Sequence, residues 1–204
     1  TKGFDADNGY DWAQLISKFT MGAMAYSQAV DNYLDEKLEA DTKPNNKPYK
    51  DGTAYTGKEH VWDEGFGYFG AAAHTLALSA DQAYGIAKRK DVASADANGD
   101  GVIDLKSEMV FGPAYYAAAF DRSGSKSTNY LNTIMQSYVD GRMLITSANG
   151  AVLTDAQRSS LKAHASVIES NWEKVLAEAV FKYAGSAYKD ISKMQEDGAD
   201  VAKV

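Results

Sequence analysis

The sequence of 204 residues contains no cysteine. This absence excludes disulfide bonds, thiolate metal ligands and thiol nucleophiles. Long apolar runs are also missing: stretches such as residues 114–120 are too short to cross a bilayer, so we expect no transmembrane segment. There is no Gly-x-Ser-x-Gly elbow and no Gly-rich phosphate loop, and only three histidines are available to assist a hydroxyl nucleophile. We therefore expect no enzyme, no catalytic residue and no organic cofactor; the alternative is a metal-assisted hydrolase.

Positive charge is in short supply, because 21 Lys and Arg residues face 28 Asp and Glu residues and give a net charge of -7. A negative field repels phosphate backbones, so we expect no nucleic-acid partner and favour a cation instead. Hydrophobic residues make up 45% and charged residues 24%, which is typical of a folded protein. The length fits a single domain over residues 1–204. The first residue, Thr1, fits removal of either a signal peptide or an initiator Met.

Proline is rare as well, and two of the three prolines, Pro44 and Pro48, lie in the polar stretch 41–57. That composition predicts a long loop. Elsewhere apolar residues recur at helical spacing, and no useful period-2 pattern of a strand appears. Three helices open with a capping box, at residues 56–59, 79–82 and 154–157. We therefore predict an all-α helical bundle. Helices are expected at residues 10–40, 56–73, 79–90, 105–121, 129–148 and from 154 onward.

An acidic loop is expected at residues 96–108. Oxygen-bearing side chains alternate along it, Gly101 allows a tight turn, and Ile103 is placed to anchor the loop to the core. This pattern is that of an EF-hand-type loop, because calcium prefers about six to eight hard oxygen ligands. The twelfth loop position is Ser107, so the closing acid comes one residue later, at Glu108. The expected ligands are Asp96, Asn98, Asp100, the Val102 carbonyl, Asp104 and Glu108. The alternative is a metal-free set of Asx turns with Asp104 as a helix cap.

A second metal candidate consists of His60, Asp63 and Glu64. On a helix both carboxylates share a face with the imidazole, because they follow it by three and four residues. An imidazole and a carboxylate begin a transition-metal site, with iron or zinc as candidate ions. The alternative is a carboxylate-oriented histidine packed beneath Trp62 and Phe66. Further ligands would have to come from His74, His164, Glu169 or Glu173. Ion pairs at helix ends are expected for Asp121 with Arg122 and for Asp140 with Arg142.

The string at residues 60–70, His-Val-Trp-Asp-Glu-Gly-Phe-Gly-Tyr-Phe-Gly, resembles the signature of an uncharacterised bacterial domain-of-unknown-function family related to imelysin-like proteins. Matching pieces follow in order at residues 98–108, 133–142 and 171–178, so the resemblance covers residues 10–190. It implies an exported helical bundle of the periplasm or cell surface, associated with iron uptake. It also implies a Gly-x-His-x-x-Glu metal motif, in which His60 matches the histidine and Asp63 stands at the glutamate position. Gly57 lies three residues before His60 rather than two, and similar chains continue with another helix beyond residue 204.

Two functional hypotheses follow. The first is an exported, non-enzymatic metal-binding protein, linked to the handling of iron or another divalent cation and carrying a structural calcium ion in the acidic loop. The second is a structural or interaction subunit that docks on a larger extracytoplasmic or membrane assembly. The expected partners are a divalent metal ion and a protein, which can be a second copy of the chain. The expected location is the periplasm, the cell surface or the exterior.

Overall fold

A computed structural model describes residues 4–5, 7–39, 43–123, 127–196 and 198. The predicted all-α class is confirmed, because these residues are mostly helical and contain no strand. One isolated antiparallel bridge joins Pro48 to Thr56 across the predicted loop. Among the described residues, no helix combines the length and the apolarity that a membrane span requires.

The N-terminal helix runs without a break from Trp12 to Glu39 but contains two π-helical stretches. Its parts are α1 (Trp12–Phe19), η1 (Thr20–Met24), α2 (Ala25–Ser27), η2 (Gln28–Glu36) and α3 (Lys37–Glu39). Asp11 caps the start by accepting a hydrogen bond from the Gln14 amide at 3.0 Å. A π turn carries an extra residue, so apolar faces on either side of it need not align. Tyr33 and Leu34 of η2 are buried, whereas α1 has no buried residue.

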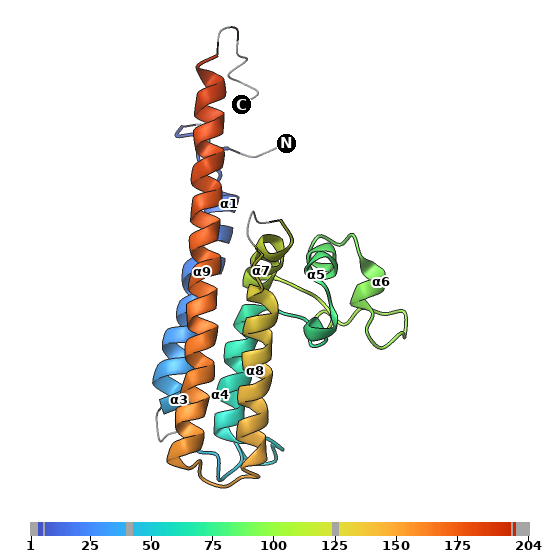
Figure 1. The fold of residues 1–204 in the computed structure, drawn as a ribbon, viewed down its shortest axis with the longest axis vertical. Coiled ribbons are helices and arrows are strands. Elements are labelled where there is room, and N and C mark those ends of the chain that lie inside the picture. Colours follow the sequence, from blue (N-terminus) through green and yellow to red (C-terminus); the bar gives the residue numbers. More distant parts are fainter. Residues whose placement is uncertain (1–3, 6, 40–42, 124–126, 197, 199–204) are drawn as a thin grey trace.

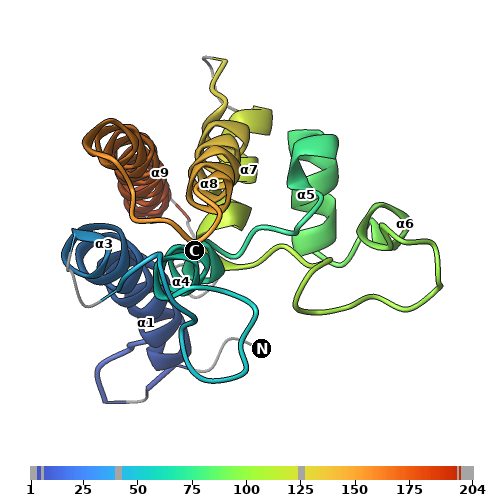
Figure 2. The same ribbon diagram turned by 90° about the horizontal axis from the view of Figure 1, so that it is seen from below.

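The main bundle packs this N-terminal helix with α4 (Gly57–Phe69), α8 (Tyr130–Ser147) and α9 (Asp155–Met194). Figure 2 shows the four seen end-on, and Figure 1 shows that α9 continues past the ends of α4 and α8. The predicted capping boxes at Thr56 and Thr154 are confirmed as the starts of α4 and α9. Because each box satisfies backbone amides locally, the sequence marks these helix starts well.

Shorter helices follow α4 in the chain. They are η3 (Thr75–Ala77), α5 (Ala80–Ala87), α6 (Val92–Ala95) and α7 (Gly112–Ser123). Of these, α5 and α6 extend to the side of the bundle while α7 packs against α8 and α9 (Figure 2). Ser79 forms the predicted capping box of α5. Arg122 does not pair with Asp121: its Nε donates to Asp81 at 2.6 Å. Asp121 instead accepts the amides of Tyr130 and Leu131, both at 2.8 Å, and so caps α8.

The predicted helix over residues 105–121 is wrong in its first part, because α7 begins only at Gly112. Tertiary hydrogen bonds hold the preceding backbone in an irregular path. The Phe111 amide donates to the Gly70 carbonyl at 2.8 Å, and the Ser107 carbonyl accepts from Ala73 at 2.7 Å. Pro113 then falls in the first turn of α7, where its missing N–H breaks no helical hydrogen bond.

The core contains two fully buried tryptophans, Trp62 of α4 and Trp172 of α9. The Trp62 indole donates to the Tyr138 carbonyl of α8 at 2.8 Å. Its ring lies directly against Gly141: a Cβ added to that glycine would sit 2.1 Å from Trp62 Cζ2. The close approach of α4 to α8 therefore depends on the absence of a side chain at residue 141.

At one end of the molecule the bundle thins to two helices. We call α1 together with residues 180–194 of α9 the stalk. Side chains from α1 and the distal part of α9 meet at one groove, which Lys18 and Tyr183 both line. Trp12, with 49% of its surface exposed, contrasts with the two core tryptophans. The exposed large apolar side chains of the stalk include Trp12, Leu15, Ile16, Phe19, Val180, Phe181, Tyr188 and Ile191.

Candidate functional site

The acidic loop follows α6 and is ordered by its own side chains. One Asp96 carboxylate oxygen accepts from the Gly99 and Asp100 amides at 2.9 and 3.2 Å, and the other accepts from Gly101 at 2.9 Å. The Asn98 side chain accepts from the Asp100 amide at 2.9 Å, and the Asp100 side chain accepts from the Val102 amide at 2.8 Å. These bonds make each oxygen-bearing side chain curl the chain that follows it.

Glu108 closes the loop. Its carboxylate accepts from the Ala97 amide at 3.1 Å and from the Asp104 amide at 2.8 Å, so it bridges the two ends of the loop. Only 4% of Glu108 is exposed. Ile103 packs against the core as expected, and the Val102 side chain is exposed. Glu108 thus closes the loop through hydrogen bonds to backbone amides, and its expected role as a calcium ligand stays a prediction.

The described residues contain no group of three or more His, Asp or Glu side chains arranged to hold a metal ion. The donor set of the loop nevertheless suits calcium, because it consists of carboxylate, amide and carbonyl oxygens and contains no nitrogen or sulfur ligand. Each oxygen that accepts one amide keeps a second lone pair. The hydrogen bonds also fit the metal-free Asx-turn alternative, so the calcium site stays a prediction.

His60 packs beside two tyrosines of the loop that precedes α4, and the ring centroids of these tyrosines are 6.0 Å apart. Its ring centroid lies 3.7 Å from that of Tyr49 and 5.7 Å from that of Tyr55. Its Nε2 lies 3.3 Å from a carboxylate oxygen of Glu64. The structure thus brings together two of the three expected ligands, and the rings that cover His60 are not Trp62 and Phe66. This arrangement matches the carboxylate-oriented histidine more closely than a metal centre.

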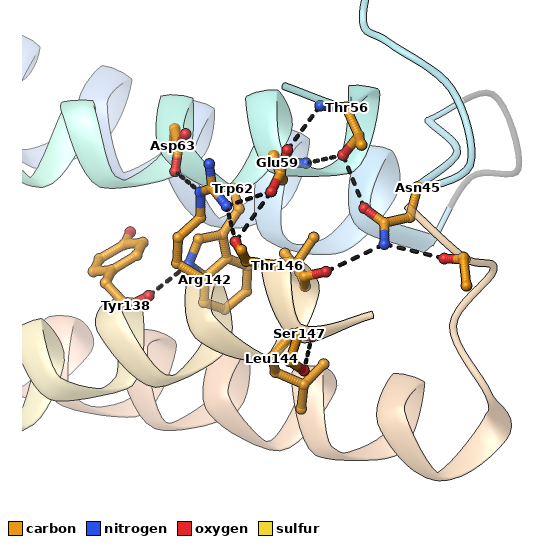
Figure 3. A network of polar contacts seen from close by, with 12 residues as sticks. Asn45, Thr56, Glu59, Trp62, Asp63, Tyr138, Arg142, Leu144, Thr146 and Ser147 are labelled. Carbon is orange, nitrogen blue, oxygen red and sulfur yellow. Dashed lines mark hydrogen bonds and ion pairs between the residues drawn. The ribbon is translucent and has the colours of Figure 1, made fainter. Parts of the chain in front are cut away.

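The third expected ligand, Asp63, belongs to a different polar network, which joins α4 to α8 (Figure 3). Arg142 of α8 donates from Nε to Asp63 at 2.8 Å and from Nη1 to Glu59 at 2.6 Å. Glu59 also accepts the Thr146 hydroxyl at 3.0 Å. The predicted pairing of Arg142 with Asp140 is therefore wrong, and Asp140 instead accepts from Gln136 at 2.7 Å.

Asn45 extends this network to the loop end of the bundle (Figure 3). Its side-chain amide donates to the carbonyls of Ile145 and Ala151 at 3.2 and 3.1 Å, and its oxygen accepts the Thr56 hydroxyl at 2.8 Å. Asn45 is 3% exposed. It therefore ties the long loop to the start of α4 and the end of α8.

A cavity of about 540 Å³ adjoins the network between α4 and α8. Trp62, Phe66 and Tyr138 are among its mainly apolar lining residues, and Arg142 and Asp63 also line it. Thr146 is the hydroxyl nearest to an acid here, but hydrogen bonds hold the pKa of Glu59 below its ordinary value, which makes that carboxylate a weak general base. The arrangement is therefore suited to clamping α4 and α8 together.

A family model described as a domain of unknown function, DUF4856, matches residues 1–202. The chain belongs to the DUF4856 family. The predicted domain-of-unknown-function family is thereby confirmed, while its relation to imelysin-like proteins and the signature at residues 60–70 stay predictions. Searches of curated proteins and of solved structures returned no match to the chain.

We call the network of Arg142 with Glu59, Asp63 and Thr146 the polar clamp. It predicts a specific response of the DUF4856 chain to acid. Burial opposes the charge of Glu59, but hydrogen bonds from Thr56, Arg142 and Thr146 outweigh it and keep the pKa of Glu59 below its ordinary 4.5. Below pH 4.5 the native state therefore binds fewer protons than the unfolded state. The stability that ionised Glu59 contributes is fully present above pH 4.5 and is lost as the pH falls through the native pKa. We expect Glu59→Gln to flatten the decline of the unfolding free energy below about pH 5.

Urea unfolding of both proteins from about pH 7 to about pH 3 measures this slope. Glu39→Gln is the matched control, because Glu39 pairs with Lys162 at the surface and its side chain is 48% exposed. An unchanged acid slope in Glu59→Gln, or an equal change in Glu39→Gln, contradicts the assignment.

Proposed function

We propose that this DUF4856 chain is an exported, non-enzymatic protein that binds a divalent cation, with calcium held structurally in the loop at residues 96–108. The observation that supports this most is the closure of the loop by buried Glu108, which bonds to the amides of Ala97 and Asp104 at its two ends. A calcium ion there would brace α6 against the irregular segment before α7. The net charge of -7 favours the uptake of cations in general.

The iron or zinc part of the proposal has narrower support. His60 and Glu64 form a pair at 3.3 Å, which is half of the usual four-ligand set for zinc. Asp63 is occupied by Arg142, whose positive charge repels a cation. A transition metal at His60 would therefore need ligands beyond those the described residues gather, and calcium is the ion we favour.

Calcium is expected to raise the melting temperature of the chelator-treated protein. With an affinity typical of extracellular calcium modules, about 1 mM calcium would stabilise the fold by about 1 kcal/mol and raise Tm by about 3 °C. Asp96→Asn and Asp100→Asn should abolish the shift, because each removes a charged ligand. Thermal unfolding with calcium, with magnesium and with chelator measures it.

Asp190→Asn serves as the charge-matched control, because Asp190 lies on the stalk, away from the loop. It should keep the full calcium shift. Equal shifts for calcium and magnesium, or a shift that survives both loop variants, would show that the ion binds elsewhere or only screens charge. Elemental analysis of protein purified from its source, with His60→Ala and Asp100→Ala variants, separates calcium from iron and zinc.

The second candidate is a structural or interaction subunit, which the exposed apolar surface of the stalk supports. α1 has no buried residue, and apolar side chains such as Ile16 and Phe181 are 64% and 74% exposed. Apolar patches of this kind mark partner sites more often than free surface. If the source protein carries calcium alone and its metal content is insensitive to His60→Ala, the result supports an interaction subunit over a protein that handles iron or another divalent cation.

A further inference from the structure

A groove that neither proposed function uses begins on the stalk and continues onto η1, α7 and the preceding part of α9. It has a volume of about 670 Å³ and lies between α1–η1, the start of α7 and α9. We call it the stalk groove. Its walls are mainly aliphatic, with Met21, Pro113, Val175 and Leu176 among them, and small residues such as Gly22 and Ala187 complete the lining. This volume lies within the range of small-molecule sites, about 300–1,000 Å³.

One cationic side chain, Lys18, lines the stalk groove. Its Nζ donates to the Tyr116 hydroxyl at 2.5 Å, and the hydroxyls of Tyr116 and Tyr183 lie 2.8 Å apart. Within the part of the chain that the structure describes, Lys18 has no carboxylate within ion-pair distance. Lys18 is partly exposed, and its Nζ also lies 5.2 Å from the ring centres of Tyr116 and Tyr183. Water, hydroxyls and aromatic faces thus stabilise the ammonium, but no counter-charge among the described residues does.

Lys18 keeps its proton. Burial opposes its charge, but interactions with the hydroxyls of Tyr116 and Tyr183 outweigh burial and raise the pKa of Lys18. An ammonium has three N–H donors, and the bond to Tyr116 uses one of them. Between the two tyrosines one O–H donates to the other oxygen, which leaves one hydroxyl proton free. An anion at this point would meet a charged N–H donor and a free hydroxyl donor together.

We propose that the stalk groove binds a fatty-acid-type carboxylate, with its carboxylate on Lys18 and the two tyrosine hydroxyls and its alkyl chain along the aliphatic walls. Two features select this ligand. The unpaired ammonium calls for a single negative charge, because the groove offers no second cation. An alkyl chain that lies along the remaining walls gains dispersion contacts and is removed from water.

Isothermal titration calorimetry with decanoate and decanol tests the proposal on the intact chain. The two probes share their alkyl chain and differ in charge. Decanoate should bind at one site per chain, at least about tenfold more tightly than decanol, because charge-assisted hydrogen bonds contribute more than neutral ones. Lys18→Met should remove that preference and leave decanol binding unchanged, and Lys18→Arg should retain it.

Lys88→Met is the matched control, because Lys88 lies 4.5 Å from the Tyr115 ring centre but does not line the stalk groove. It should bind decanoate as the wild type does. Far-UV circular dichroism checks that each variant is folded. Equal binding of both probes, or decanoate binding that survives Lys18→Met, overturns the proposal. A dimer in sedimentation experiments would also overturn the proposal if Lys18→Met dissociates it and decanoate does not. In that case a second copy of the chain fills the groove.

Discussion

A Gly141→Ala variant should lose about 3 kcal/mol of unfolding free energy, which corresponds to a fall in Tm of about 6–12 °C for a chain of this size. The added methyl group would lie 2.1 Å from Trp62 Cζ2 and 2.6 Å from Cη2. The indole is 1% exposed and is held by its bond to the Tyr138 carbonyl, so turning it toward the adjoining cavity would break that bond. α4 and α8 must therefore separate, which disturbs the core on both sides. Differential scanning calorimetry measures the loss.

Gly67→Ala is the control for Gly141→Ala. Gly67 also lies within a helix, α4, but a Cβ there would meet nothing within 4 Å. The same substitution should therefore stabilise the protein by up to about 1 kcal/mol, since alanine favours helix more than glycine. If Trp62→Leu restores part of the stability of Gly141→Ala, steric overlap with the indole is the cause. A Gly141→Ala protein as stable as Gly67→Ala would refute the close approach.

An Arg142→Met variant should lose about 2–3 kcal/mol, because it leaves Glu59 without its cation in a largely buried position. The Glu59 side chain is 11% exposed and that of Arg142 31%. The value lies below that of a fully buried pair, since Asp63, the other partner, is half exposed. Methionine keeps much of the length and apolar stem of arginine, so the loss reports charge and hydrogen bonding. Urea unfolding at neutral pH measures it.

The double variant of Arg142→Met with Glu59→Gln should lose less unfolding free energy than the two single variants lose in sum, by more than about 1 kcal/mol. The reason is that neutral glutamine no longer requires the arginine. Lys162→Met is the surface control. Lys162 pairs with Glu39, both side chains are about half exposed, and exposed pairs contribute less than about 1 kcal/mol. Additive losses in the double variant would show that Arg142 stabilises the bundle only by packing.

The starts of α4, α5 and α9 could be predicted from sequence because their signal is local. In each, a Ser or Thr side chain and a Glu or Gln three residues later satisfy each other's backbone amides. The start of α7 could not be predicted in this way. Residue 111 bonds to Gly70, which is far away in sequence, so the irregular segment before α7 results from tertiary contact and not from propensity.

The polar clamp was missed for a similar reason. Arg142 lies two residues from Asp140 in sequence, which suggests a local pair, but its partners Glu59 and Asp63 are on another helix. Spacing within one helix indicates which residues share a face and does not indicate what that face meets. The same applies to His60, whose Glu64 partner follows from helical spacing, whereas its covering rings, Tyr49 and Tyr55, come from the long loop.

The distribution of the three tryptophans gives the molecule a built-in optical reporter. Trp62 and Trp172 are sealed in the core, whereas half of the Trp12 surface faces water. Acrylamide or iodide in the solvent therefore reaches the fluorescence of one indole in three, and the red-shifted part of the emission comes from the stalk. A molecule that covers α1 should therefore protect the Trp12 emission from quenching and leave the emission of Trp62 and Trp172 unchanged. Occupancy of the stalk can thus be measured without any label.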